Sequence, residues 1–352
     1  MSYDYKEIVP FLLNWFDYNA RILPWRENPQ PYYVWISEIM LQQTRVEAVK
    51  GYFYRFTEVI PDIEALARIE DEKLMKLWEG LGYYNRARNL KKAAQFILND
   101  YNGELPSDYK ELLKLPGIGV YTAGAIASIA FGKPEAAIDG NVLRIGKRIA
   151  GSLDDITKES VKKELSEDFK RIIPKDRPGD FNQALMDLGA GICLPNGKPL
   201  CGQCPVMHLC QAYHKDMVMQ IPVKPPKKER RIEKRTILLM ECENGYLIHK
   251  RASKGLLAGL WELPGIEEKL SAAKLRKVLE EEGLRIASIE SLGSAKHIFS
   301  HLEWHMAGYH VVMQEMPRKY LQNTSYVMAD AAELKSAYTL PSAFAAYTKG
   351  LW

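Results

Sequence analysis

The chain has 352 residues, of which 47% are hydrophobic and 26% are charged, and its formal net charge is +4. This length predicts two or three domains, and the apolar fraction excludes a disordered protein. So small a positive charge is weak evidence for a nucleic-acid partner. No apolar run is long enough to span a bilayer, and the N-terminus MSYDYKEIVP lacks a signal-peptide pattern. We therefore expect a cytoplasmic protein with no membrane partner.

The first part of the chain is predicted to be helical. Residues 1–20 have an amphipathic pattern, with Ile8, Phe11, Leu12 and Trp15 on one face. A polar and aromatic loop follows at 21–26 and contains Arg26. Further helices are expected to begin at Pro31 and to span 46–59 and 63–77.

Glu38 lies among large apolar residues in the helix that begins at Pro31. A solvated glutamate is the usual interpretation of an acid on a helix. The alternative is a carboxyl group in apolar surroundings, where burial raises its pKa enough for it to donate a proton near neutral pH. Both interpretations remain open on the pattern alone.

A loop with two glycines, at 80–83, precedes a helix that carries Arg86, Arg88, Lys91 and Lys92. Such charges usually form a solvated face. Aromatic residues beside arginines at a loop tip also fit contact with DNA, through stacking and phosphate pairing.

The segment LPGIG at 115–119 interrupts the helical pattern. A helix with an Asp108 and Glu111 capping box is expected to end near Leu115, because Pro116 and Gly117 do not continue a helix. The next helix, 120–131, then starts with amides that Gly117 and Gly119 leave unshielded, which suits one phosphate group. A plain helical hairpin is an equally good interpretation of this motif.

Asp139 is expected to cap the start of a helix at 141–150. An aspartate in this position also suits the stabilisation of a cationic sugar, so the two roles are compatible. Two further helices are predicted at 158–172 and 180–190.

Four cysteines within eighteen residues indicate a metal centre in a reducing compartment rather than disulfides. They are Cys193, Cys201, Cys204 and Cys210. The spacing is compatible with structural zinc and with a [4Fe–4S] cluster.

The last part of the chain changes character after a proline-rich and basic stretch at 217–235. Two apolar runs flank Glu243-Asn244-Gly245 and predict a hairpin, in which Cys242 is a buried strand residue. A helix with the sequence RKVLEEEGL follows, and a strand is expected to begin near Phe299-Ser300-His301.

These motifs, in this order, resemble the MutY-type adenine DNA glycosylases, and the resemblance covers essentially the full chain. It is carried by SEIMLQQTRV, WEGLGYYNRARNL, LPGIGVYTAGAI, IDGNVLR, FNQALMDLGA and FSH. It implies a multidomain protein: a mainly α helix-hairpin-helix glycosylase domain with an iron–sulfur loop, and an α+β Nudix-like domain. The implied regions are 1–214 (a six-helix module at about 26–131 and an iron–sulfur module at 1–25 and 132–214), a linker at 215–234, and a reader of 8-oxoguanine at 235–352.

The resemblance also implies a monofunctional enzyme that removes adenine mispaired with 8-oxoguanine or guanine in double-stranded DNA. Its implied catalytic residues are Glu38 as the proton donor and Asp139 beside the sugar, supported by Tyr121 and Asn141. The implied substrate-binding residues are Arg26, Gln43, Tyr83, Gln183, Phe299, Ser300 and His301. Contact with the DNA backbone is implied for Gly117, Gly119, Val120 and Arg86.

The same resemblance implies a [4Fe–4S] cluster on the four cysteines, although the first gap is seven residues where the family has six. Lys277 stands where the Nudix box normally has a metal-binding glutamate, so we expect no nucleotide hydrolysis. We also expect a monomer associated with a bacterial nucleoid. Three alternatives are kept: a thymine-glycol or mismatch glycosylase with lyase activity, an iron–sulfur DNA-binding redox sensor, and a Nudix hydrolase with a DNA tether.

Overall fold

The structure is a computed structural model that describes all residues except 1–2, 227–228, 244, 316–319, 321 and 352. The chain divides into two compact units, Met1–Ile69 with Arg88–Pro226 and Glu70–Ala87 with Lys227–Trp352. No helix in the described part of the chain is long and apolar enough to cross a membrane.

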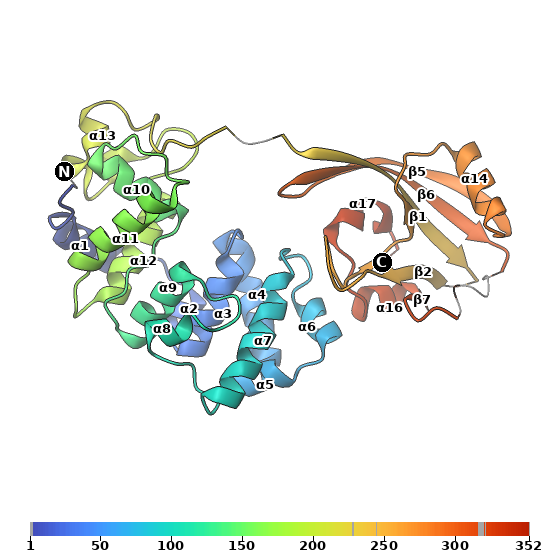
Figure 1. The fold of residues 1–352 in the computed structure, drawn as a ribbon, viewed down its shortest axis with the longest axis horizontal. Helices are drawn as coiled ribbons and strands as arrows, with labels where there is room; N and C mark the ends of the chain where they lie inside the picture. The colour runs from blue at the N-terminus through green and yellow to red at the C-terminus, as the bar shows by residue number, and fades with distance from the viewer. Residues whose placement is uncertain (1–2, 227–228, 244, 316–319, 321, 352) are drawn as a thin grey trace. The chain divides into compact units, whose positions relative to one another are not determined.

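The first unit is helical, as predicted (Figure 1). Its helices are α1 (Ile8–Asn19), α2 (Pro24–Glu27), α3 (Pro31–Leu41), α4 (Val46–Val59), α5 (Ile63–Arg68), α7 (Asn85–Asp100), α8 (Tyr109–Leu112), α9 (Val120–Phe131), α10 (Gly140–Ala150), α11 (Glu159–Ile172), α12 (Pro178–Gly191) and α13 (Gln211–His214). The first turn of α7, before Arg88, is grouped with the second unit. Short 3-10 turns, η1 (Cys201–Gln203) and η2 (Met207–Leu209), lie between α12 and α13.

The predicted apolar face of the first helix is partly wrong. α1 buries Ile8, Leu12 and Phe16, which are spaced four residues apart, whereas Phe11 is 46% exposed. The buried row packs with α10, α11 and α12 in one hydrophobic core that includes Phe169 and Phe181. The stripe that faces the core is therefore narrower than the apolar pattern of the sequence.

The expected helix at 63–77 is two helices. α5 ends at Arg68, and Ile69 and Glu70 have extended backbone before α6 (Asp71–Leu77) begins. Asp62 caps α5 through the amide of Ala65. The apolar periodicity continues across the break, so the pattern alone did not reveal it.

The helix before the hairpin is capped by Asp108, but the expected capping box is wrong. The Asp108 carboxylate accepts hydrogen bonds from the amides of Lys110 and Glu111. The Glu111 side chain instead accepts from the Tyr101 hydroxyl (2.7 Å) and from Lys114. Gly117 has a φ of +81°, which explains why a glycine stands in this turn.

The segment that leads to Asp139 is held tightly between α9 and α12. A Cβ atom on Gly124 would lie 2.4 Å from the carbonyl oxygen of Ala136, so only glycine permits this approach. The Asn182 side chain accepts from the amide of Ala137 (3.1 Å) and donates to Ser128 and to the carbonyl of Glu135. These contacts determine where Asp139 starts α10.

The second unit contains a mixed sheet, and the predicted α+β class is confirmed. The strand order is β3–β2–β1–β6–β5, with β4 paired to β1 and β7 to β2. β1 and β6 are parallel, whereas β5 and β6 form an antiparallel hairpin. The elements are α6, β1 (Arg231–Cys242), β2 (Gly245–Lys250), β3 (Trp261–Glu262), β4 (Gly265–Ile266), α14 (Ala272–Glu281), β5 (Ile286–Ile298), β6 (Leu302–Met313), β7 (Tyr326–Ala329), α16 (Ala331–Ser336), η3 (Ser342–Phe344) and α17 (Ala345–Thr348).

Both faces of this sheet are covered. Leu238 and Val311 pack with Leu275 of α14 on one face, and Leu239 and Trp304 pack with residues of the C-terminal helices on the other. Figure 1 shows α14 on one side of the sheet and α16 and α17 on the other. Successive side chains of β1 and β6 therefore point to opposite faces of the sheet and pack into two separate hydrophobic cores.

The second unit contains the predicted hairpin between β1 and β2 and the predicted strand near residue 300. Cys242 is buried and pairs with Gly245, as expected, while Asn244 lies outside the described residues. A strand was expected to begin near Phe299-Ser300-His301, and this is confirmed: β6 begins at Leu302, and these three residues form the turn that joins β5 to β6. The pattern missed β5 because that edge strand is mostly exposed and lacks clear alternation.

Candidate active site and cysteine centre

A pocket of about 580 Å³ lies within the first unit. It is lined by α2 and the loop before it, by α3, α9 and α12, and by the starts of α4 and α10. Six of the predicted site residues line it: Arg26, Glu38, Tyr121, Asp139, Asn141 and Gln183. Residues that are distant in the sequence therefore meet at one cavity.

Glu38 is buried, with 4% of its surface exposed. Its Oε2 atom accepts a hydrogen bond of 2.9 Å from the Tyr121 hydroxyl. Burial raises the pKa of Glu38 to about 7; the Tyr121 hydrogen bond and the charge of Arg26 act in the opposite direction, and Asp139 adds to the rise. The solvated interpretation of this glutamate is wrong, and the carboxyl group can hold a proton near neutral pH.

Asp139 caps α10 as predicted. Its Oδ1 atom accepts from the amides of Asn141 and Val142, both at 2.8 Å. Its Oδ2 atom accepts from the Asn141 side chain at 2.7 Å. Three N–H donors therefore hold the orientation of this carboxyl group at the wall of the pocket.

Arg26 is held in the pocket wall by Asp187, a residue that sequence reasoning missed. Both terminal nitrogens of Arg26 donate to the Asp187 carboxylate, at 2.8 and 2.9 Å, and Arg21 donates to it as well. One signal was present in the sequence: Asp187 follows Gln183 by four residues, so it shares the same helix face.

The hairpin residues lie at the surface before α9. Gly117, Gly119 and Val120 are exposed, and α9 has no side-chain cap at Gly119. The Asn89 side chain packs against Gly117, where a Cβ atom would be 2.7 Å from the Asn89 Cβ. The first amides of α9 are thus open to an external acceptor.

The other predicted substrate-binding residues lie outside this pocket. Gln43 is exposed just after α3, with a φ of +58°. Within the second unit, the Tyr83 hydroxyl is 3.2 Å from Ser300 Oγ, and both side chains are exposed. Phe299 packs edge-to-face on Trp304, and His301 is exposed beside it in the turn.

Arg86 braces the loop that presents Tyr83. Its guanidinium donates to the carbonyls of Leu81 and Gly82 and lies over the Trp78 ring. This half-buried side chain is turned toward the loop backbone. A direct contact with a DNA phosphate stays a prediction.

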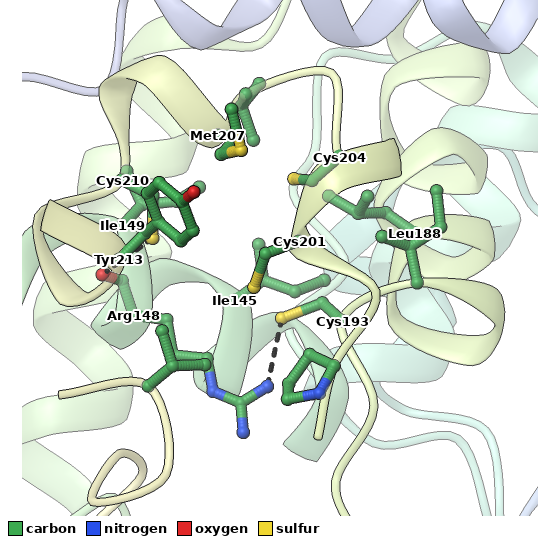
Figure 2. Close-up of a pocket in the computed structure, with 14 residues that line it drawn as sticks. Ile145, Arg148, Ile149, Leu188, Cys193, Cys201, Cys204, Met207, Cys210 and Tyr213 are labelled. Atoms are coloured by element: carbon green, nitrogen blue, oxygen red, sulfur yellow. Dashed lines mark hydrogen bonds between the residues drawn. The ribbon is translucent and has the colours of Figure 1, made fainter. Parts of the chain in front are cut away.

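The four clustered cysteines line one cavity in the first unit, next to Ile145 and Leu188 (Figure 2). None of them forms a disulfide. Arg148 donates to the Cys193 sulfur at 3.3 Å, and Figure 2 shows this guanidinium beside the thiol.

A backbone hydrogen bond joins the two ends of the seven-residue segment between Cys193 and Cys201. The amide of Leu200 donates to the carbonyl of Ile192 at 3.0 Å, and Gly197 has a φ of +71°. This bond returns the chain so that Cys201 faces the same cavity as Cys193. Among the described residues, no three His, Cys, Asp or Glu side chains are grouped closely enough to hold a single metal ion.

Comparison with known proteins gives two family matches. The model described as HhH-GPD superfamily base excision DNA repair protein matches residues 36–171, and the NUDIX domain model matches residues 235–349. Among solved structures, a thermostable thymine-DNA glycosylase is 34% identical with a TM-score of 0.54, over 60% of this chain and 96% of that chain. A non-covalent endonuclease III–DNA complex is 29% identical with a TM-score of 0.53, over 62% of this chain and 99% of that one.

The fold and the pocket therefore define a helix-hairpin-helix base-excision glycosylase with a Nudix-like C-terminal domain. Relatives named adenine DNA glycosylase extend over most of the chain. The mouse protein is 34% identical, over 89% of this chain and 73% of its own length. The protein of Buchnera aphidicola subsp. Baizongia pistaciae is 36% identical, over 83% of this chain and 82% of its own. The chain belongs to the adenine DNA glycosylase family.

The buried carboxyl of Glu38 makes stability depend on pH. The group takes up a proton more readily in the folded state, with a pKa of about 7, than in the unfolded state, where the usual value is 4.5. Stability is therefore lost as pH rises through this window. Between pH 4.5 and 8, we expect the free energy of unfolding of wild type to fall by about 2–3 kcal/mol relative to that of Glu38→Gln. Urea unfolding of both proteins across this range measures the difference, and a difference that does not change with pH would contradict the assignment.

Proposed function

We propose that the protein removes adenine that is mispaired with 8-oxoguanine, or with guanine, in double-stranded DNA. The single observation that carries this proposal is the meeting of Glu38 and Asp139 at one pocket, beside Tyr121. To reach these groups, the adenine must leave the base stack, at a cost of a few kcal/mol that backbone contacts offset. The exposed hairpin at Gly117–Val120 and the loop at Tyr83 are the proposed sites of those contacts.

Glu38 is the proposed general acid. Adenine is a poor leaving group until a ring nitrogen is protonated, and a positioned acid typically contributes about 10²–10⁴-fold to such a step. The pKa of about 7 supports this role, because the carboxyl still carries its proton near neutral pH. Tyr121 holds the carboxyl in place through its 2.9 Å hydrogen bond.

Asp139 is the proposed partner of the sugar. As the glycosidic bond breaks, the sugar gains positive charge, and a fixed carboxylate stabilises that charge electrostatically or through a transient bond. Asn141 orients Asp139, and Gln183 and Arg26 line the same pocket as proposed contacts for the base. The two carboxyl groups thus have different tasks.

The proposed reaction is hydrolysis without strand cleavage by a lyase step. A lyase needs an amine that attacks the sugar, whereas the residue that lines the pocket beside Glu38 is Tyr121. Burial raises the pKa of this hydroxyl well above its usual value, so it stays neutral and donates to Glu38. A phenol cannot form a Schiff base.

The proposed reader of 8-oxoguanine is the turn at Phe299-Ser300-His301. Tyr83 of the same unit and Gln43 of the first unit are each proposed to enter the base stack that the adenine vacates. The 3.2 Å contact between Tyr83 and Ser300 supports it, because a hydroxyl pair at an exposed position can exchange partners with a base. We also propose that the protein acts as a monomer on the bacterial chromosome.

Cys193, Cys201, Cys204 and Cys210 are the proposed ligands of a [4Fe–4S] cluster. Four thiols that line one cavity fit this group, because a [4Fe–4S] cluster is held by four cysteine thiolates. When bound, the cluster would supply a crosslink between the thiolates of the loop. Arg148 would offset part of their negative charge.

The acid pair gives a direct test. Glu38→Gln and Asp139→Asn should each lower the single-turnover rate of adenine release at least about 10²-fold, while binding to the duplex is retained. Asparagine can still cap α10, so a loss of activity in Asp139→Asn is not a loss of the helix start. Glu159→Gln, an exposed glutamate on α11 that pairs with Lys162, is the matched control. Release that survives either site variant would contradict the assigned roles.

Ser300→Ala should reduce discrimination between 8-oxoguanine and guanine opposite adenine. The loss of one hydrogen bond to the oxidised base corresponds to roughly a fivefold change in the ratio of the two release rates. Ser336→Ala on α16 provides a serine control in the same unit. Unchanged discrimination would remove Ser300 from the reader.

Protein purified without oxygen should be brown and should contain about four iron and four sulfide per chain. Cys204→Ser should lower both counts, whereas Cys242→Ser should not, because Cys242 is buried in the sheet of the second unit. A colourless protein with one zinc per chain would contradict the cluster.

A further inference from the structure

Asp187 is the most strongly engaged carboxylate beside the pocket. It is 3% exposed on α12 and accepts hydrogen bonds from two arginines. Arg21 donates from its backbone amide (3.1 Å) and from Nε (2.7 Å). Arg26 donates from both terminal nitrogens, at 2.8 and 2.9 Å. Burial by itself raises the pKa of Asp187, but its bonds and charge pairing with these arginines lower it below the usual value.

The bidentate contact with Asp187 determines where the positive charge of Arg26 lies. A guanidinium that is bound through both terminal nitrogens has a fixed plane, and this one also lies over the Phe16 ring. One terminal nitrogen further donates to the carbonyl of Arg21. These contacts bind the terminal nitrogens to the Asp187 carboxylate on α12 and to the carbonyl of Arg21.

If Arg26 were not bound to Asp187, Glu38 would be the pocket acid whose protonation it would affect most. Tyr121 is the only hydrogen-bond partner of its carboxyl group among the described residues. The charged and titratable groups around it are Tyr121 from α9, Asp139 before α10, Arg26 from α2, and Asp187 from α12, with Arg21, Arg45 and Glu47 also on the pocket wall. An arginine paired with Glu38 would favour its carboxylate form, which has no proton to donate.

We propose that Asp187 is a positioning residue that withholds Arg26 from Glu38, so that Glu38 keeps the proton it delivers to the base. This inference rests on the proposed function, because it assigns a task to a neighbour of the proposed general acid. Asp187 itself does not touch the substrate. It acts through the orientation of Arg26 and by balancing the arginine charge.

The test is the pH dependence of single-turnover adenine release. In wild type, the rate should fall as pH rises through about 7, because Glu38 loses its proton. In Asp187→Asn, the fall should move to lower pH by about one unit, since a cation near an acid favours its charged form. The rate ratio of wild type to variant should therefore be about tenfold larger at pH 8 than at pH 5.

Two variants separate charge from fold. Asp187→Glu keeps the charge and should retain the wild-type pH profile, even where its rate is lower. Asp180→Asn removes a carboxylate from the same helix that pairs with Arg177 outside the pocket, so it should leave the profile unchanged. Where Asp187→Asn does not fold, Asp187→Ser carries the same expectation, because it also removes the charge.

A titration that does not need activity distinguishes the two levels of the proposal. Carbon-13 NMR of labelled glutamate carboxyls, with Glu38→Gln to assign the resonance, follows the proton on Glu38 directly. Its midpoint should be lower in Asp187→Asn than in wild type. An unchanged midpoint would overturn the role of Asp187, whereas a wild type that releases no adenine would overturn the proposed function alone.

Discussion

The carboxylate of Asp139 is the point on which the organisation of the first unit depends. It caps α10, and the side chain of Asn141 continues the contact inward. Arg144 then donates to Asn141 (2.9 Å), to the carbonyl of Gly189 and to the carbonyl of Cys193. A continuous chain of hydrogen bonds therefore connects the pocket with Cys193, the first of the four clustered cysteines.

This chain requires that α10 and α12 lie very close together. A Cβ atom on Gly189 would be 2.9 Å from the Cβ of Asn141, so a glycine is needed where the helices meet. Arg144 is buried between them at 3% exposure. Its guanidinium donates to the carbonyl oxygens of Cys193 and Gly189 and to the side-chain oxygen of Asn141. A displacement of the cysteine loop would move the carbonyl of Cys193 and so reach Asp139 through two side chains. The position of the cysteine loop is thus coupled to the orientation of Asp139 in the pocket.

Much of this arrangement could be predicted from the sequence because it rests on local signals. The turn at Gly117, the cap at Asp139 and the cysteine spacing each need only a few neighbouring residues. Glu38 was harder, because a glutamate between apolar residues is compatible with both burial and exposure, and only the packing of α9 and α12 against α3 decides. Asp187 was missed, because its partners Arg21 and Arg26 are more than 160 residues away in the chain.

The grouping of residues 70–87 with the sheet was also beyond local patterns. The Glu72 carboxylate accepts from Lys250 and from the Trp261 indole nitrogen, and Lys76 donates to the carbonyl of Tyr338. From the local sequence, Glu72, Lys76 and Lys250 are ordinary surface charges. Only the fold shows that they bind the sheet and its covering helices.

This grouping has a consequence for the proposed reader. Tyr83 has a φ of +48° at the tip of its loop, and Arg86 holds that tip by its backbone carbonyls. The same segment contacts the sheet through Glu72 and Lys76, so Tyr83 and Ser300 are presented by one packed unit. Their hydroxyls are thus paired with each other in the structure without a base. Recognition then costs the exchange of one exposed hydrogen bond, which is small compared with the discrimination that a buried base edge can provide.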